Sequence, residues 1–167
     1  MNAQTIRKQQ VWVTLRNNVG ATLFEILIVT AVVGLLAQAG ATVSLDLMPR
    51  YRLQSATQRL AWDLMRARRQ AVKQNQSITV RLSNAHTYTI WDDDNADGVV
   101  DPGEAIDKIV DIHDTAPGIS VTTGAPFPFI LFYTSRGVPN APVTLTVANG
   151  SGANNVQVRV TGHIDVP

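Results

Sequence analysis

The sequence predicts an α+β protein in which a long N-terminal helix packs on an antiparallel β-sheet. Three observations lead to this prediction. An uncharged run from Ile26 to Leu45 is long enough for a helix that crosses a bilayer. A second helical stretch follows it, with apolar residues spaced by three or four positions. After Asn75 the apolar pattern has a period of two, so all expected strands follow the helices.

The composition limits the function classes. The chain has 167 residues, enough for one domain with an additional element. Its net charge of +1 does not indicate a nucleic-acid partner. The absence of cysteine excludes a disulfide framework, a thiolate metal site and a catalytic thiol. The histidines, His86, His113 and His163, are scattered singly and no nucleophile motif accompanies them, so the chain is not expected to be an enzyme.

The N-terminal segment differs from a secretory signal peptide. Its basic residues Arg7, Lys8 and Arg16 precede the apolar run, and so does the small-residue pair Gly20-Ala21. In a secretory signal the cleavage site follows the apolar run. Cleavage after Gly20 would therefore leave the apolar helix on the protein. The basic residues favour a cytoplasmic N-terminus, which would place the remainder of the chain outside the inner membrane.

The segment GATLFE, from Gly20 to Glu25, resembles the type IV prepilin processing site. That site consists of a glycine, the scissile bond, four mostly apolar residues, a glutamate and a long apolar run. The resemblance implies that a prepilin peptidase cleaves after Gly20 and that the new terminus, Ala21, is N-methylated. Most family members have Phe or Met where this chain has Ala21, but the spacing from glycine to glutamate is intact.

The same resemblance implies a role in assembly for Glu25. An unpaired carboxylate in a bilayer is costly, about 2.5–3.5 kcal/mol for Asp at a helix centre on insertion scales. After cleavage, the amine of Ala21 in one subunit can pair with Glu25 of a neighbour in a helical filament. The alternative is an interfacial glutamate on an ordinary single-span anchor.

Pro49 is expected to interrupt the helix before a second, amphipathic stretch. Asp63 in that stretch is spaced to pair with Arg59 and Arg66, and Trp62 is expected in the helix–sheet core together with Trp91. One face of the stretch is apolar: Leu53, Ala56, Leu60, Leu64, Ala67 and Ala71. Another face carries a basic stripe: Arg52, Arg59, Arg66 and Lys73. This stripe is either a solvated face or a contact for lipid headgroups, an acidic neighbour or DNA.

Seven strands are expected after the helix, with no second helix between them. Ser83, Asn84 and Ala85 separate the first two as a hairpin turn. The expected strands are residues 77–82, 86–91, 107–113, 118–123, 128–134, 143–148 and 156–166.

This body resembles the H-type minor pseudopilins and FimT-type minor pilins. Three segments carry the resemblance: LAWDLMRARRQAVKQNQSITVRL, FILFYTSRGVPN and VRVTGHIDV. It implies a prepilin leader at residues 1–20, a transmembrane and filament-core helix at 21–48, and a periplasmic pilin-like domain at 49–167. The implied function is that of a minor subunit in a type II secretion pseudopilus or a type IV pilus, near the tip. The implied partners are other pilins or pseudopilins, a prepilin peptidase, an inner-membrane assembly platform and the lipid bilayer.

A DNA-binding minor pilin for DNA uptake is the alternative. The FimT-type variants that bind DNA carry a basic Gly-Arg-x-Arg stretch near the C-terminus. The matching residues here are Gly162, His163, Ile164 and Asp165, so both basic positions are lost. A nucleic-acid partner is therefore not expected.

An acidic loop between two expected strands has the spacing of a calcium-binding loop. Calcium takes six to eight oxygen ligands, and a glycine at position 6 permits the sharp turn. Asp92 and Asp94 add charge that repels unless a cation is bound. The alternative is an acidic solvated turn, since Asp, Asn and Gly favour turns by themselves. Pro102 and the absence of flanking helices depart from the EF-hand pattern. The candidate Ca²⁺ ligands are Asp93, Asn95, Asp97, the carbonyl of Val99, Asp101 and Glu104, with Gly98 at the turn.

Overall fold

The computed structural model describes residues 22–166, with the backbone alone for residues 39–46. The chain divides into two compact units, residues 1–41 and 42–167. The first helix, α1, runs from Leu23 to Gln74, and its N-terminal part belongs to the first unit. The second unit, called the body below, contains the rest of α1, all the strands and the whole buried core.

Pro49 lies inside α1, so the prediction that it interrupts the helix was wrong. A proline within a helix removes one backbone hydrogen bond and bends the helix, but the turns on both sides keep theirs. The turn that contains Pro49 also has a partner in the body, because Asn149 Nδ2 donates to the Pro49 carbonyl oxygen at 2.7 Å. The helix therefore continues through the proline.

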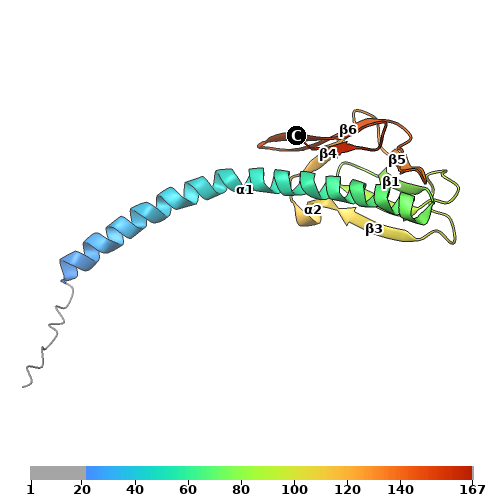
Figure 1. Cartoon of the computed structure of the whole chain (residues 1–167). Helices are drawn as coiled ribbons and strands as arrows, with labels where there is room; N and C mark the ends of the chain where they lie inside the picture. The colour runs from blue at the N-terminus through green and yellow to red at the C-terminus, as the bar shows by residue number, and fades with distance from the viewer. Residues whose placement is uncertain (1–21, 167) are drawn as a thin grey trace, which may run out of the picture. The chain divides into compact units, whose positions relative to one another are not determined.

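The strands form two antiparallel four-stranded sheets rather than one (Figure 1). The first sheet has the order β3-β2-β1-β5 and the second β4-β6-β7-β8. The α+β class and the antiparallel pairing are confirmed. The strands are β1 (Ile78–Leu82), β2 (Thr87–Asp92), β3 (Ile106–Asp111), β4 (Ser120–Thr122), β5 (Phe129–Tyr133), β6 (Val143–Asn149), β7 (Gly152–Val158) and β8 (Ile164–Asp165).

Two expected strands differ in the structure. The third ends at Asp111, where a short helix, α2 (Ile112–Thr115), begins. The Asp111 carboxylate caps α2 by accepting a hydrogen bond from the His113 backbone N–H at 2.8 Å, which ends the strand. The last expected strand is broken into β7 and β8, because Gly162 turns the chain with a φ of 78°.

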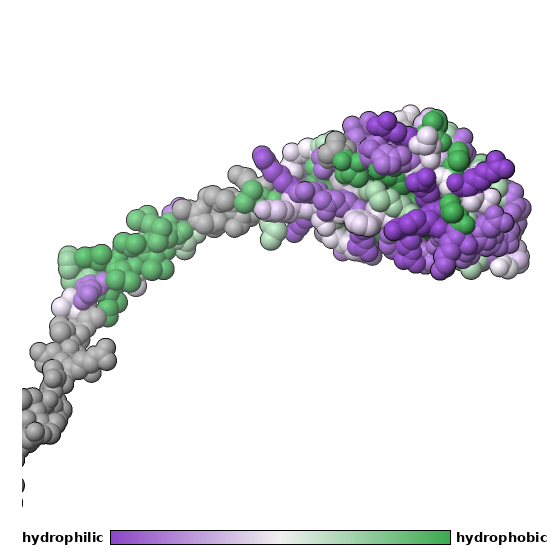
Figure 2. Space-filling view, in the orientation of Figure 1, coloured by the Kyte–Doolittle hydropathy of each residue, from purple (hydrophilic) through white to green (hydrophobic). Residues whose placement is uncertain are grey.

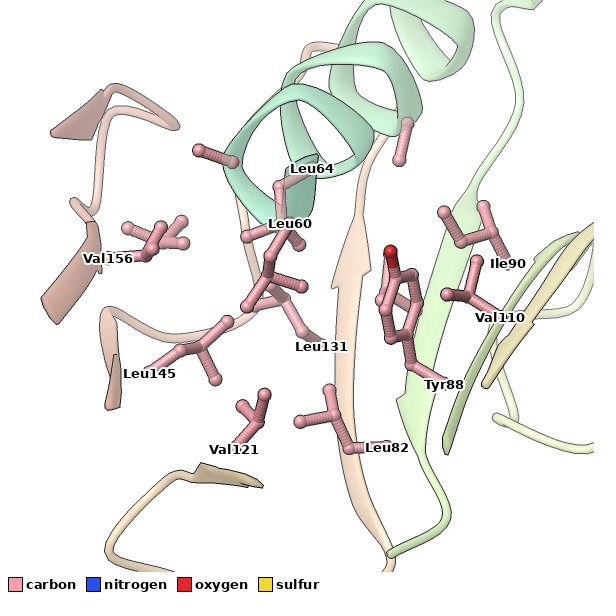
Figure 3. Close-up of a cluster of buried hydrophobic side chains, with 14 of the residues drawn as sticks. Leu60, Leu64, Leu82, Tyr88, Ile90, Val110, Val121, Leu131, Leu145 and Val156 are labelled. Atoms are coloured by element: carbon pink, nitrogen blue, oxygen red, sulfur yellow. The ribbon is translucent and has the colours of Figure 1, made fainter. Parts of the chain in front are cut away.

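The core lies between α1 and the two sheets (Figure 3). The predicted apolar face of the helix is confirmed, with Ala56 half-buried and the other five residues buried. Trp91 is buried, but Trp62 is 61% exposed, so its prediction was wrong. Trp62 is two residues from Leu60 and from Leu64, which places it on the opposite side of the helix. Figure 3 labels the helix residues Leu60 and Leu64 with strand residues Leu82, Tyr88, Ile90, Val110, Val121, Leu131, Leu145 and Val156.

Arg68 joins the helix to a turn beside each sheet. Its Nε donates to the carbonyl oxygen of Gly137 at 3.0 Å, and its Nη2 donates to that of Thr161 at 3.2 Å. Gly137 follows β5 of the first sheet, and Gly162 lies between β7 and β8 of the second. Both glycines have positive φ, and a Cβ on Gly162 would lie 2.1 Å from the Gly137 carbonyl oxygen. Only glycine lets the two turns approach each other this closely.

Gly162→Ala is therefore expected to lower the free energy of unfolding by roughly 2–4 kcal/mol, from backbone strain and overpacking. Gly150→Ala is the matched control, because Gly150 has no positive φ and no atom near its would-be Cβ. The control is expected to change stability by about 0.5 kcal/mol or less. Urea unfolding of the body measures both variants. Equal midpoints for the two would contradict the close approach of the turns.

Candidate assembly site and acidic loop

The first turn of α1 is capped. Thr22 Oγ1 accepts a hydrogen bond from the Glu25 backbone N–H at 3.2 Å, and the Thr22 carbonyl accepts one from Ile26 at 3.1 Å. Thr22 and Glu25 have the Thr-x-x-Glu spacing of a capping box. An acidic residue in the first turn is stabilised by the helix dipole, typically by about 0.3–1 kcal/mol. The cap was not among the features predicted from the sequence, although its spacing is plain there.

The N-terminal part of α1 exposes an apolar surface (Figure 2). The Thr30 hydroxyl lies within hydrogen-bond distance of the Ile26 and Leu27 carbonyl oxygens, at 2.9 and 3.0 Å, so its donor has a partner inside the helix. Large apolar side chains are exposed on every side: Leu23, Phe24, Ile26, Leu27, Ile28, Val29, Val32, Val33, Leu35 and Leu36. Within the residues that the structure describes, no helix has both the length and the hydropathy of a bilayer span.

Gly20 and Ala21 lie outside the described residues. Leader cleavage and N-methylation at these positions stay predictions. Glu25 is described and exposed in the first turn of α1, and its role in assembly stays a prediction.

The single acidic residue of the amphipathic stretch, Asp63, has partners distant in sequence. The expected pairing of Asp63 with Arg59 or Arg66 is not found. Asp63 is buried and accepts hydrogen bonds from Lys108 Nζ at 2.7 Å and from Tyr88 Oη at 2.5 Å. Burial raises the pKa of the Tyr88 phenol, and the hydrogen bond and charge of Asp63 raise it further. These contacts connect the helix to β2 and β3.

The acidic loop after β2 is anchored by Asp93, which is fully buried. Its carboxylate accepts a hydrogen bond from Thr79 Oγ1 at 2.6 Å and from the backbone N–H groups of Gly98 and Asp97 at 3.0 and 3.2 Å. Gly98 has a φ of 75°, and a Cβ there would lie 2.8 Å from Ile130 Cδ1. Asp93 and Gly98 together hold the loop against β1 and β5.

The other candidate calcium ligands bond within the loop. Asn95 Nδ2 donates to the carboxylates of Asp97 and Asp101, at 3.1 and 3.0 Å. Glu104 accepts from the backbone N–H groups of Asp94 at 3.1 Å and of Asp101 at 2.8 Å. The Val99 N–H donates to Asp97 Oδ1 at 2.7 Å. Among the described residues, no three acidic or histidine side chains converge as a metal site.

Negative charge accumulates around this loop. Burial raises the pKa of Asp92, and the charges of Asp107, Asp94 and Glu104 raise it further. A cation at the loop would reduce this repulsion. In the structure the loop is closed by its own hydrogen bonds. Calcium binding therefore stays a prediction.

The sequence suggested that the three histidines are scattered singly. In the structure two of them lie close together. The ring centroids of His86 and His113 lie 5.8 Å apart, with the planes at 69°. His86 Nδ1 lies 2.9 Å from the Ile119 carbonyl oxygen. His163 pairs instead with Asp165 at 3.0 Å. No third metal ligand joins the histidine pair within the described part of the chain.

Comparisons with known proteins agree with this architecture. A family model described as type II transport protein GspH matches residues 56–162. The pilin-like protein PilA1 of Thermus thermophilus is 28% identical over 155 residues, which cover 85% of this chain and 92% of that protein. The type IV minor pilin FimU of Pseudomonas aeruginosa aligns with a TM-score of 0.59 at 20% identity, over 71% of this chain and 90% of that one. A second crystal form of FimU gives a TM-score of 0.53 at 19% identity, over 68% and 91%. The two alignments show a shared fold.

Asp93→Ala is expected to destabilise the body by about 2–3 kcal/mol, because the Thr79 hydroxyl and two backbone N–H groups would lose their acceptor. Asp94→Ala is the matched control, since Asp94 is exposed and accepts only from Gln76 Nε2 at 3.0 Å. This control is expected to cost about 0.5 kcal/mol or less. Thermal melts of the body without added metal measure both. Similar melting temperatures would show that Asp93 does not anchor the loop.

Proposed function

Because the chain belongs to the GspH family of minor pilins and pseudopilins, we propose that it assembles through its N-terminal helix into a filament. The filament is a type II secretion pseudopilus or a type IV pilus, with this subunit near the tip. Its role is structural, and catalysis is no part of it. The sheets of the body present surfaces to partner subunits or cargo.

The apolar surface at the start of α1 is the observation that carries this proposal. Ten large apolar side chains between Leu23 and Leu36 are exposed in the single chain. Removing apolar surface from water is worth about 25 cal/mol per Å², so this helix gains stability from a bilayer or from a bundle of similar helices. We propose that it anchors the subunit in the inner membrane first and enters the filament core afterwards, with the body in the periplasm.

Glu25 favours the transfer of the helix from the bilayer into the filament. In the bilayer its carboxylate is costly to bury. In the filament it pairs with the amine of Ala21 on a neighbouring subunit, after a prepilin peptidase has cleaved behind Gly20 and the terminus has been methylated. The assembly platform in the inner membrane and the other pilins are the partners of this step. The cap on Thr22 bonds the backbone N–H of Glu25 and leaves its carboxylate free for this pair.

DNA binding is the alternative function. The turn before β8 gives little support for it. Gly162 is a turn glycine there, and Asp165 carries a negative charge where the DNA-binding variants have a basic residue. Arg159 and His163 both pair with Asp165, at 2.5 and 3.0 Å. These contacts place a carboxylate beside the two basic residues that flank the turn in the sequence.

We expect Glu25→Gln to reduce incorporation into filaments severalfold while leaving membrane insertion intact, because the charge pair is lost and the bilayer cost falls. Sheared filaments from cells that make all partner pilins are quantified against the membrane fraction. The intact mass of the incorporated wild-type subunit should lack residues 1–20 and carry one added methyl group.

Thr22→Ala is the control, because it removes the cap, worth about 1 kcal/mol, but keeps the carboxylate. It should be incorporated nearly as well as wild type. Equal incorporation of Glu25→Gln and wild type would rule out the charge pair. A full-length mass in the presence of active peptidase would rule out the processing step.

We also propose that the acidic loop binds Ca²⁺ once its internal bonds open. The carboxylates of Asp97 and Asp101 both lie within 3.1 Å of one point, the Asn95 nitrogen that bridges them. A cation at this point would replace the bridge and neutralise two charges. Asp93, the side-chain oxygen of Asn95, the Val99 carbonyl and Glu104 complete the proposed ligands.

Binding to the folded state alone stabilises it by about 2.7 kcal/mol at a hundredfold excess over Kd. Extracellular sites of this type have a Kd of roughly 10⁻⁴–10⁻³ M. The body should therefore melt several degrees higher in 10 mM Ca²⁺ than in chelator. Glu104→Gln should remove this difference, whereas the Asp94→Asn control should keep it. A melting temperature that Ca²⁺ does not change would show that the loop is only an acidic turn closed by its own hydrogen bonds.

A further inference from the structure

The end of the body at which α1 enters it carries exposed apolar, aromatic and basic side chains. Leu47, Met48 and Tyr51 are 43%, 57% and 62% exposed. Arg50 and Arg52 are exposed in the same stretch of the helix. Tyrosine and arginine collect at the level of lipid head groups, because their apolar parts and their polar ends suit different surroundings. This end of the body is therefore a candidate membrane surface.

Two hollows open on this surface. The first has a volume of about 580 Å³ and lies between α1 and the turn that joins β6 to β7, with Arg50 and Asn149 in its wall. The second has a volume of about 260 Å³ and lies between α1 and the end of α2, with Met48 and Tyr51 in its wall. Arg52 lines both hollows. A polar and a largely apolar hollow thus meet at one arginine.

The wall of the first hollow is fixed by the fold. The hairpin of β6 and β7 reaches α1 (Figure 1), where Asn149 Nδ2 donates to the Pro49 carbonyl oxygen at 2.7 Å. Asn149 Oδ1 accepts from the Ser151 N–H at 2.9 Å and from the Ser151 hydroxyl at 2.7 Å. The turn is therefore held against the helix before any ligand binds, which lowers the entropy cost of binding.

The positive charge of Arg52 is available to a ligand. None of the four ion pairs among the described side chains involves this residue. No acidic residue lies three or four positions from it in the sequence, so helical spacing offers it no partner either. Arg50 adds a second positive charge at the first hollow. A guanidinium group binds phosphate oxygens with two parallel hydrogen bonds, so the charge and the geometry suit a phosphate.

The place of this surface in the chain favours a phospholipid over an acidic protein segment. The uncharged run that is expected to cross the bilayer ends at Leu45, and Arg52 follows about 10 Å further along the helix. The cations Arg69 and Lys73 lie roughly 25–30 Å beyond Arg52 on the same helix. A phospholipid also combines an anionic phosphate with apolar chains, as the two hollows require.

We propose that this end of the body binds the head group of an anionic phospholipid. The phosphate lies at Arg50 and Arg52, and the first carbons of the acyl chains lie against Met48 and Tyr51. The contact rests on the proposed membrane anchoring, and it holds the body at the bilayer surface until assembly. A basic residue strengthens binding to an anionic membrane by about fivefold. Two such residues form a contact weak enough to open when the subunit enters the filament.

The absence of cysteine allows a single fluorescent reporter in the full chain. Ala153→Cys is suitable, because Ala153 is exposed in β7 near the first hollow but does not line it. The labelled chain is reconstituted into vesicles with nitroxide-labelled head groups, made of phosphatidylcholine alone or of equal parts phosphatidylcholine and phosphatidylglycerol. Quenching is expected to be severalfold stronger with phosphatidylglycerol. Arg52→Glu should reduce it to the level in neutral vesicles, whereas Arg69→Glu, the same charge change on a distant turn, should keep it.

Equal quenching in the two kinds of vesicle would overturn the proposal. So would an equal loss of quenching in Arg52→Glu and Arg69→Glu, since net charge alone would then explain the attraction. Unchanged quenching in Arg52→Glu, with reduced incorporation into filaments, would assign Arg52 to a contact with another subunit and also overturn it. Cosedimentation with the vesicles is measured on the same samples. Cosedimentation without lipid-dependent quenching would contradict this contact alone, whereas a chain that does not cosediment with either kind of vesicle would contradict the proposed membrane anchoring, and this contact with it.

Discussion

The body depends on one side chain that reaches from the helix to a turn beside each sheet. Arg68 donates to carbonyl oxygens in two turns that are close in space but distant in sequence. Those turns approach so closely that a methyl group on Gly162 would overlap the Gly137 carbonyl. The helix, the end of β5 and the β7–β8 connection are therefore positioned together. A groove of about 430 Å³ lined by Arg68 and Gly162 lies on this junction, so its shape follows from the same constraint.

The sequence predicted the features that local pattern controls. The period of the apolar residues in α1 identified its buried face, and alternation identified most of the strands. The sequence did not reveal the partner of Asp63. Arg59 and Arg66 are near it at helical spacing, whereas Lys108 comes to 2.7 Å only when the sheet has folded. The division into two sheets was missed for a similar reason, since strand pairing depends on contacts far apart in the chain. The predicted helix break at Pro49 was wrong because the regular turns around the proline outweigh its helix-breaking tendency.

The acidic loop shows where reasoning from spacing stops. Carboxylates at alternate positions suit a calcium loop, but they also suit a turn that satisfies its own backbone N–H groups. The spacing is the same in both, and only the directions of the oxygens differ. Asp93 illustrates this, since its two oxygens accept three hydrogen bonds inside the protein. At the helix start, by contrast, the spacing of Thr22 and Glu25 was informative and was overlooked.

The position of β3 at the edge of the first sheet has a consequence for solubility. An edge strand leaves backbone N–H and C=O groups open, and it can recruit strands of other molecules into aggregates. Ile109 is 65% exposed on that strand, which adds to this risk. Three charged residues interrupt the strand, Asp107, Lys108 and Asp111, and β3 gives way to α2 directly after the last of them. These charges, and the helix that ends the strand, thus protect an open edge from unproductive strand addition.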